Sequence, residues 1–302
     1  IITGLNAKCG EIIGKNDGSF KTTTFVNPLF HTTVSIDDAT RIPELAIALE
    51  TLNDEDPDLH LSYNKTTGQM SIDLMGHLQA EIIGNMLQER FSLNVNFSNP
   101  IIIHKETPSS IGYGKTSFDR VSSVEFKIEP LPLGSGLQYE SKASTDYLFT
   151  KYQKQIERLV NMYSKQGLYG WEITDAKITL IDGKSDSVCS EPAHYNVAVP
   201  IALMRCIKDA GMQLLEPVMQ YEITSPKEDF KKVISATSSM GVEYDKISEK
   251  NDNYLIPGSA PLSNILDLPY TITRLTGGHG SMIRKTNGFV LKSDGEILER
   301  DY

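Results

Sequence analysis

The sequence is poor in cysteine and has no apolar run long enough to cross a bilayer. Its three cysteines, Cys9, Cys189 and Cys206, are far apart and odd in number. This argues against a disulfide framework and suits a reducing cytoplasm. The first residues also lack the basic and apolar regions of a signal peptide. We therefore expect a cytoplasmic globular protein, and the start without Met suggests a piece of a longer polypeptide.

Recognised catalytic and metal-binding motifs are also missing. There is no HExxH, no CxxC and no paired-cysteine zinc spacing, and the six histidines are scattered. Cys189 and His194 share the segment "VCSEPAHY", but no glycine-rich turn that could form an oxyanion hole stands beside them. The sequence thus predicts no catalytic residue and no metal ligand in this chain. Separately, its length of 302 residues suggests two or three domains.

Excess positive charge is absent too, since the formal net charge is −10. Generic nucleic-acid binding needs clustered Lys and Arg, so any RNA contact must be local. The best candidate is "RKTNGF", with Arg284 and Lys285, near Arg274 and His279. These four residues are candidate rRNA contacts; on charge alone they fit a solvated basic face equally well.

One stretch, "SSIGYGKTS", ends like a phosphate-binding loop. Such a loop needs a glycine five residues before its Gly-Lys-Thr, and that position is Ser109. The following text alternates like a strand instead of opening a helix. We interpret the stretch as a loop that leads into a strand.

The periodicity predicts two similar units around a different one. Residues 27–104 show the order β-α-β-β-α-β, with one helix patterned by Ile42, Leu45, Leu49 and Leu52 and a second by Leu78, Ile82, Met86 and Phe91. A hairpin turn is predicted at 65–68. Residues 216–302 repeat this order, the split βαβ plan of ferredoxin-like domains. The middle third instead predicts two long helices, over 145–167 and 191–215.

Several phrases together resemble elongation factor G and its relatives. Residues 27–83, "NPLFHTTVSI…HLQAEII", resemble the third domain of that family. "AGMQLLEPVMQYEITSP" resembles the passage from the fourth to the fifth domain, and "TRLTGGHGSM" carries the "T-x-G-x-G" signature at Thr276, Gly278 and Gly280. Arg274 stands two residues before Thr276, where the family has its arginine three before. The phrases "IEPLPLGSGLQYES" and "QGLYGWEITDAKITL" resemble the tetracycline ribosomal-protection proteins more than ordinary elongation factor G.

This resemblance implies an α+β fold, with two ferredoxin-like βαββαβ domains flanking a ribosomal-protein-S5-like α/β domain. Residues 1–25 would be the tail of the β-barrel domain II, 26–104 domain III, 105–216 domain IV and 217–302 domain V. The chain would be the C-terminal half of a translational GTPase. GTP and Mg would then bind to an N-terminal domain outside this chain, and no cofactor is expected here.

The resemblance also implies a partner and a site. The partner is the ribosome, through 16S and 23S rRNA and ribosomal proteins, with the chain acting as a monomer away from membranes. The tip loop of domain IV would approach the decoding region and dislodge tetracycline. The matching loop lies within "DGKSDSVCSEP", and its ribosome-binding residues are Lys184, Ser185, Asp186, Ser187, Val188, Cys189 and Ser190.

The tip departs from the family at one place. Protection proteins carry an aromatic residue followed by Ser-Pro-Val-Ser, and the aligned residues here begin at Asp186 and contain no proline. A stacking surface and a rigid turn are therefore missing. Two alternatives follow: an elongation-factor-G-like paralogue with another ribosomal role, or a stand-alone ribosome- or RNA-binding protein without a GTPase.

Overall fold

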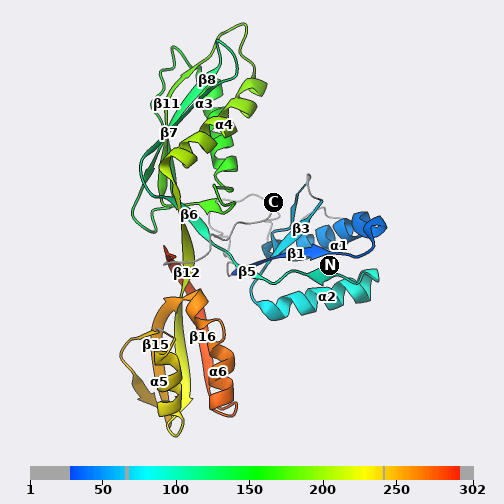
Figure 1. Cartoon of the computed structure of the whole chain (residues 1–302), viewed down its shortest axis with the longest axis vertical. Coiled ribbons are helices and arrows are strands. Elements are labelled where there is room, and N and C mark those ends of the chain that lie inside the picture. The colour runs from blue at the N-terminus through cyan, green and yellow to red at the C-terminus, as the bar shows by residue number, and fades with distance from the viewer. Residues whose placement is uncertain (1–27, 65–67, 241, 293–302) are drawn as a thin grey trace, which may run out of the picture. The chain divides into compact units, whose positions relative to one another are not determined.

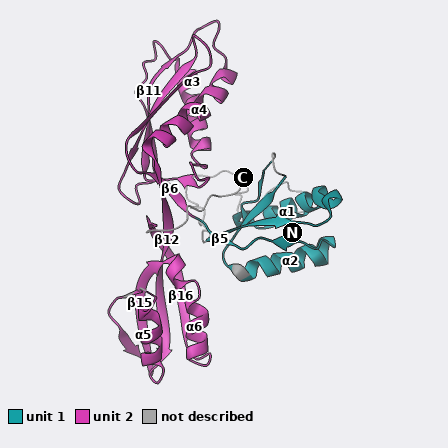
Figure 2. Ribbon diagram, viewed as in Figure 1, with its two compact units in different colours: residues 1–103, 302 teal, residues 104–301 magenta. Residues whose placement is uncertain are grey.

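The computed structural model of the chain describes residues 28–64, 68–240 and 242–292. They form two compact units that divide between Ile103 and His104 (Figure 2). Both units combine helices with antiparallel-rich sheets, so the fold is mixed α/β. None of the described helices is long and apolar enough to cross a membrane.

The first unit has the element order that the sequence predicts (Figure 1). Its elements are β1 (Phe30–Ser35), α1 (Ile42–Glu55), β2 (Ser62–Tyr63), β3 (Met70–Leu74), α2 (His77–Phe91), β4 (Asn96–Phe97) and β5 (Ile101–Ile102). The sheet order is β2-β3-β1-β4, and β5 pairs with β1. Strands β2 and β3 pair antiparallel, as the predicted hairpin requires, while turn residues 65–67 lie outside the described residues.

Helix α2 buries a different face from the one that its periodicity suggests. Leu78 and Ile82 are 73% and 57% exposed, whereas Ala80, Ile83 and Leu87 are buried. This helix has apolar residues on two faces, and periodicity alone cannot select the one that packs on the sheet.

In the second unit, a four-stranded sheet has the order β7-β8-β11-β9. Its strands are β7 (Gly112–Ser117), β8 (Ser123–Pro130), β9 (Leu137–Ser141) and β11 (Ala176–Lys184). Helices α3 (Thr150–Tyr163) and α4 (Pro192–Ala210) pack on one face of this sheet (Figure 1). Their shared core includes Phe126, Tyr152 and Tyr195. Helix α3 starts five residues later than predicted, because 144–149 form a loop.

Helix α4 ends before the predicted position. Gly211 adopts a φ of +65°, a left-handed conformation that a helix interior cannot contain, and Met212 begins a strand. The apolar run that follows Gly211 fits a helix and a buried strand equally well, and the glycine decides between them.

The predicted loop at "SSIGYGKTS" is wrong, because Gly112–Ser117 is strand β7, paired antiparallel with β8. A Cβ on Gly112 would lie under 3.0 Å from the backbone of Cys206 and Ala210, and one on Gly114 from the backbone of Ala202 and Cys206. The two glycines therefore let α4 lie directly against the strand. Their spacing of two residues places both on the same face of the sheet, toward α4.

The larger sheet of this unit is organised by one long strand, β12 (Met212–Pro226). Its first residues pair with β6 (Lys105–Pro108), and the rest pair with β15 (Asn253–Pro261) and β16 (Ser281–Leu291). The sheet also contains β10 (Glu172–Ile173), β13 (Glu243–Tyr244) and β14 (Ser248–Lys250). The boundary predicted after residue 216 falls inside β12, so no linker marks it.

Helices α5 (Phe230–Ser238) and α6 (Leu268–Leu275) complete this part. Pro269 lies in the first turn of α6, where its missing N–H has no cost. The glycine cluster "LTGGHG" connects α6 to β16. Gly277 and Gly278 have φ of +58° and +89°, and the Thr276 hydroxyl accepts from the Gly280 N–H at 2.8 Å.

A buried carboxylate fixes the turn after α3. Glu106, fully buried on β6, accepts hydrogen bonds from the N–H groups of Leu168 (2.7 Å), Tyr169 (2.9 Å) and Trp171 (2.8 Å). Burial raises the pKa of Glu106, and the three N–H donors oppose that shift. The phrase "QGLYGW" thus has a structural role, since a Cβ on Gly167 would collide with this carboxylate.

The contact between β7 and α4 gives the first prediction. Gly114→Ala forces a methyl group into the α4 backbone, which cannot move without displacing the helix. We expect a loss of about 1–3 kcal/mol in the free energy of unfolding, measured by denaturant titration. Ser117→Ala, at the exposed end of the same strand, should change it by less than about 0.5 kcal/mol. Equal stability of the two variants would contradict the close packing.

Candidate functional site

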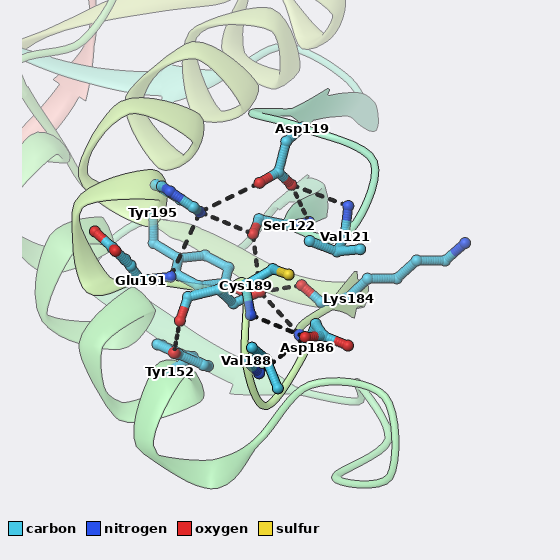
Figure 3. A network of polar contacts seen from close by, with 12 residues as sticks. Asp119, Val121, Ser122, Tyr152, Lys184, Asp186, Val188, Cys189, Glu191 and Tyr195 are labelled. Atoms are coloured by element: carbon cyan, nitrogen blue, oxygen red, sulfur yellow. Dashed lines mark hydrogen bonds and ion pairs between the residues drawn. The ribbon is translucent and has the colours of Figure 1, made fainter.

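The predicted tip loop connects β11 to α4 at one end of the four-stranded sheet (Figure 3). Four of its residues are exposed: Lys184, Ser187, Val188 and Cys189. Val188 is 86% exposed. Ser185 and Asp186 are partly buried, and Ser190 is buried. The loop therefore divides into a presented part and an anchored part.

Asp186 shapes the presented part. Its Oδ1 accepts from the N–H groups of Val188 (2.8 Å) and Cys189 (2.9 Å). These two backbone hydrogen bonds favour the charged carboxylate and lower the pKa of Asp186. The result is a tight turn with Ser187 and Val188 at its apex, a local arrangement typical of aspartate.

Ser190 anchors the other end of the loop. Its hydroxyl accepts from the Asp186 N–H at 2.8 Å and lies 2.9 Å from the Ser122 hydroxyl, while its carbonyl accepts from the Tyr152 hydroxyl. The Tyr195 hydroxyl donates to the Lys184 carbonyl at 2.6 Å, and burial raises the pKa of Tyr195 to about 12. Two buried tyrosines thus hold the loop from the core side (Figure 3).

A neighbouring loop, 144–149, forms hydrogen bonds with the tip loop through Ser185. The Ser185 N–H donates to the Tyr147 carbonyl at 2.7 Å, and the Ser185 hydroxyl accepts from the Phe149 N–H at 3.0 Å. The Ser185 hydroxyl is therefore committed to the protein. The Tyr147 side chain is 66% exposed, so an aromatic ring stands beside the tip although none occupies position 186.

Cys189 and His194 do not form a thiol–imidazole pair. His194 Nδ1 lies 3.1 Å from the Ser122 hydroxyl and 3.4 Å from an Asp119 carboxylate oxygen, and its ring stacks on Phe118. This trio is no catalytic triad either, because serine and aspartate approach the same ring nitrogen and Ser122 is fully buried. The cluster ties the β7–β8 turn to the start of α4.

The second predicted set does not gather on one face. Arg274 and His279 are exposed around the end of α6. Arg284 and Lys285 are neighbours on β16, so their side chains point to opposite faces of the sheet. Arg284 is partly buried, and this burial lowers its pKa. Arg284 and Lys285 nevertheless both line one shallow pocket, together with Gln220, Tyr221, Glu222, Pro257 and Ile283.

No group of three or more His, Cys, Asp or Glu side chains suited to a metal ion occurs within the described ranges. The remaining thiol there, Cys206, is buried against β7, and burial raises its pKa to about 12. Cys189 is exposed. The arrangement offers hydrogen-bonding, cationic and apolar groups on an anchored loop, which is suited to contact with a partner.

Three consecutive family models match the chain. Elongation Factor G, domain III, covers residues 25–99; Elongation factor G, domain IV, covers 119–211; and Elongation factor G C-terminus covers 213–300. The tip loop lies in the second of these regions.

The chain belongs to the elongation factor G family.

Relatives within this family are tetracycline resistance proteins. TetP of Clostridium perfringens is 32% identical over 295 residues, which cover 96% of this chain and 45% of TetP. TetO of Campylobacter jejuni is 31% identical over 267 residues, covering 87% of this chain and 42% of TetO. TetM from transposon Tn916 of Enterococcus faecalis is 29% identical over 268 residues, with the same coverage. The chain thus spans less than half the length of these relatives. The resemblance predicted from the sequence is confirmed.

A crystal structure of a Thermus thermophilus protein shares the fold. Its TM-score is 0.67 at 21% sequence identity, and the match covers 90% of this chain and 42% of that protein.

The residues that hold the loop were not found from the sequence. Ser122, Tyr152 and Tyr195 lie 68, 38 and 11 positions from the atoms that they bind. Two tyrosines and a serine in apolar or turn segments have no distinctive spacing. Only the Asp186 turn has a recognisable sequence pattern, because an aspartate in a polar turn tends to accept a hydrogen bond from the backbone N–H two residues further on.

The Asp186 turn gives the second prediction. In Asp186→Ala the Val188 and Cys189 N–H groups lose their acceptor, so amide hydrogen exchange at both should accelerate. Ser187→Ala, at the exposed apex, should leave both protected. In the unchanged protein the two amide NMR signals should titrate with a midpoint below 3.8, the ordinary aspartate pKa, and the turn should lose this support as pH falls through that lowered value. A midpoint at or above 3.8 would contradict the hydrogen bonds.

Proposed function

We propose that this chain is the ribosome-binding part of a translational GTPase related to the tetracycline resistance proteins. The observation that carries the proposal is the tip loop: it is anchored by Ser190, Tyr152 and Tyr195, yet it exposes Lys184, Ser187, Val188 and Cys189. An ordered polar loop at the end of a domain can enter between RNA elements, where a cation and hydroxyl groups contact phosphate and sugar.

The proposed architecture is two ferredoxin-like domains flanking an S5-like domain. The antiparallel order β2-β3-β1-β4 supports this for the first, and β12, β15 and β16 with α5 and α6 support it for the last. The four-stranded sheet under α3 and α4 is the domain that carries the tip.

In the complete protein, the tip would reach the decoding region of the small subunit and displace tetracycline. GTP and Mg would bind to a domain outside this chain, and the protein would act in the cytoplasm as a monomer on 16S and 23S rRNA and ribosomal proteins. The names of TetP, TetO and TetM support the link to tetracycline. The exposed ring of Tyr147 supports a stacking contact beside the tip.

A specific observation favours a second candidate. Asp186 folds back onto its own backbone, where the protection proteins carry an aromatic ring. A tip with this turn suits an elongation-factor-G-like paralogue with another ribosomal role. A stand-alone ribosome- or RNA-binding protein without a GTPase is the third candidate.

Thiol labelling at Cys189 tests ribosome binding by the tip. In a Cys9→Ser background, a maleimide should modify exposed Cys189 and not buried Cys206. Saturating ribosomes should slow the labelling of Cys189 several-fold. The matched control carries Cys9→Ser, Cys189→Ser and Ser135→Cys. Its new thiol lies in the turn at the opposite end of the four-stranded sheet, and ribosomes should change the labelling of this thiol little. Unchanged labelling of Cys189 would refute the proposal.

Growth and translocation assays separate the first two candidates. Expression of the complete protein in a sensitive host should raise tolerance to tetracycline, and Val188→Asp at the tip should abolish this effect without unfolding the protein, because that side chain is exposed. If tolerance is unchanged while the purified protein moves tRNA on the ribosome, the paralogue is correct.

A further inference from the structure

The outer side of α3 carries an unpaired row of positive charge. Lys151, Lys154 and Arg158 lie on the helix and Lys165 in the turn that follows, and all four are exposed. At 3.6 residues per turn they fall within an arc of about 60°, opposite the buried face formed by Tyr152, Ile156 and Val160. We call these four residues the α3 row. It extends for roughly 20 Å at 1.5 Å per residue.

The α3 row differs from the lysines on the open face of the sheet in the same domain, whereas exposed Lys184 and Lys208 also form no ion pair with a described residue. On the open face of the sheet, Lys115 pairs with Glu125 and Lys177 with Glu140, each at 2.7 Å. Lys127 pairs with Glu129 in the same way. Members of the α3 row form no ion pair with a described residue. The sheet face is therefore locally neutral, whereas residues 150–165 contain four cations against one carboxylate, a net charge of +3 in a chain of −10.

Helix stability does not explain this arrangement. Lys151 stands in the first turn of α3, where the partial positive charge of the helix disfavours cations, and that turn contains no acidic residue. The single carboxylate, Glu157, lies toward β9, where burial raises the pKa of Tyr139 and the charge of Glu157 raises it further. The Lys151 Nζ lies 4.6 Å from the centroid of the Tyr152 ring, a cation–π contact, and the row has no carboxylate partner among the described residues.

The row is continuous with the candidate tip. Loop 144–149, which Ser185 binds through the Tyr147 carbonyl, leads directly into α3. Lys151 thus lies close to the tip, and the row runs away from it along the domain. Phosphates in a nucleic acid repeat along a backbone, and cations spaced along one side of a helix can match such a repeat.

We propose that the α3 row is a second RNA-binding surface, which holds the phosphate backbone of a duplex RNA segment while the tip contacts its target. No aromatic side chain is exposed within this helix, so the surface offers charge without base stacking, as backbone binding to a duplex requires. The proposal adds to the proposed ribosome binding, and its partner is RNA and not an acidic protein.

The test compares two triple variants of the whole chain with equal charge change. The first is Lys154→Gln, Arg158→Gln, Lys165→Gln; the control is Lys208→Gln, Lys231→Gln, Lys246→Gln, at exposed positions on other elements. Binding to an RNA duplex of about 16 base pairs and to ribosomes is measured over a salt series. The plot of log K against log salt should become flatter by about 0.7–0.9 for each phosphate that the first variant no longer neutralises, and stay unchanged in the control.

The outcomes are distinguishable. Equal slopes for both variants and the parent chain would overturn the α3 proposal while leaving the tip proposal intact. Weaker binding to ribosomes with unchanged binding to the duplex would show an acidic protein partner and would also overturn it. Failure of the parent chain to bind ribosomes would refute the proposed function, and the duplex measurement would still decide on the α3 row. Unchanged thermal midpoints confirm that the variants fold.

Discussion

The contact between β7 and α4 determines where the loop between β11 and α4, the candidate tip, is built. Gly112 lies against Cys206 and Ala210, and Gly114 lies one turn further back, against Ala202 and Cys206. Helix α4 and strand β7 therefore run antiparallel in direct contact. Because the strand runs toward the start of the helix, Phe118, just after β7, meets His194 in the first turn of α4, and their ring centroids lie 4.4 Å apart. Any side chain at the two glycines would separate the elements and remove the support of the tip.

That support makes the tip a preorganised loop. Binding by a loose loop loses conformational entropy of about 1–2 kcal/mol for each ordered backbone residue. Here Asp186, Ser190 and Tyr195 hold the backbone before any partner arrives. Asp186 accepts from its own backbone and the Ser185 hydroxyl accepts from the Phe149 N–H, so the exposed groups of the loop are those of Lys184 and residues 187–189.

The sequence predicted much of the fold because helical and strand periodicities are local signals. The order of elements in the first unit, the buried positions of α1 and the long helices of the middle third all follow from them. The errors arose where local text allows two structures. "GYGKTS" fits a loop or a strand, and the helix that packs on Gly112 and Gly114 is about 90 residues away in sequence, so its packing is invisible locally. Likewise, the end of α4 depends on the conformation of a single glycine.

The site was predictable only in its outline. Family phrases located the loop, but the division between anchored and presented residues depends on Ser122, Tyr152 and Tyr195, which reach it from other elements. The net charge was also a poor guide to partners. At physiological salt, charges separated by more than about 8 Å are largely screened from one another. A phosphate near α3 therefore responds to the local excess on that helix, while carboxylates elsewhere in the chain have little influence. An acidic protein can bind a polyanion where cations without ion-pair partners gather at one surface, as they do along α3, while the lysines on the open face of the neighbouring sheet are paired with carboxylates.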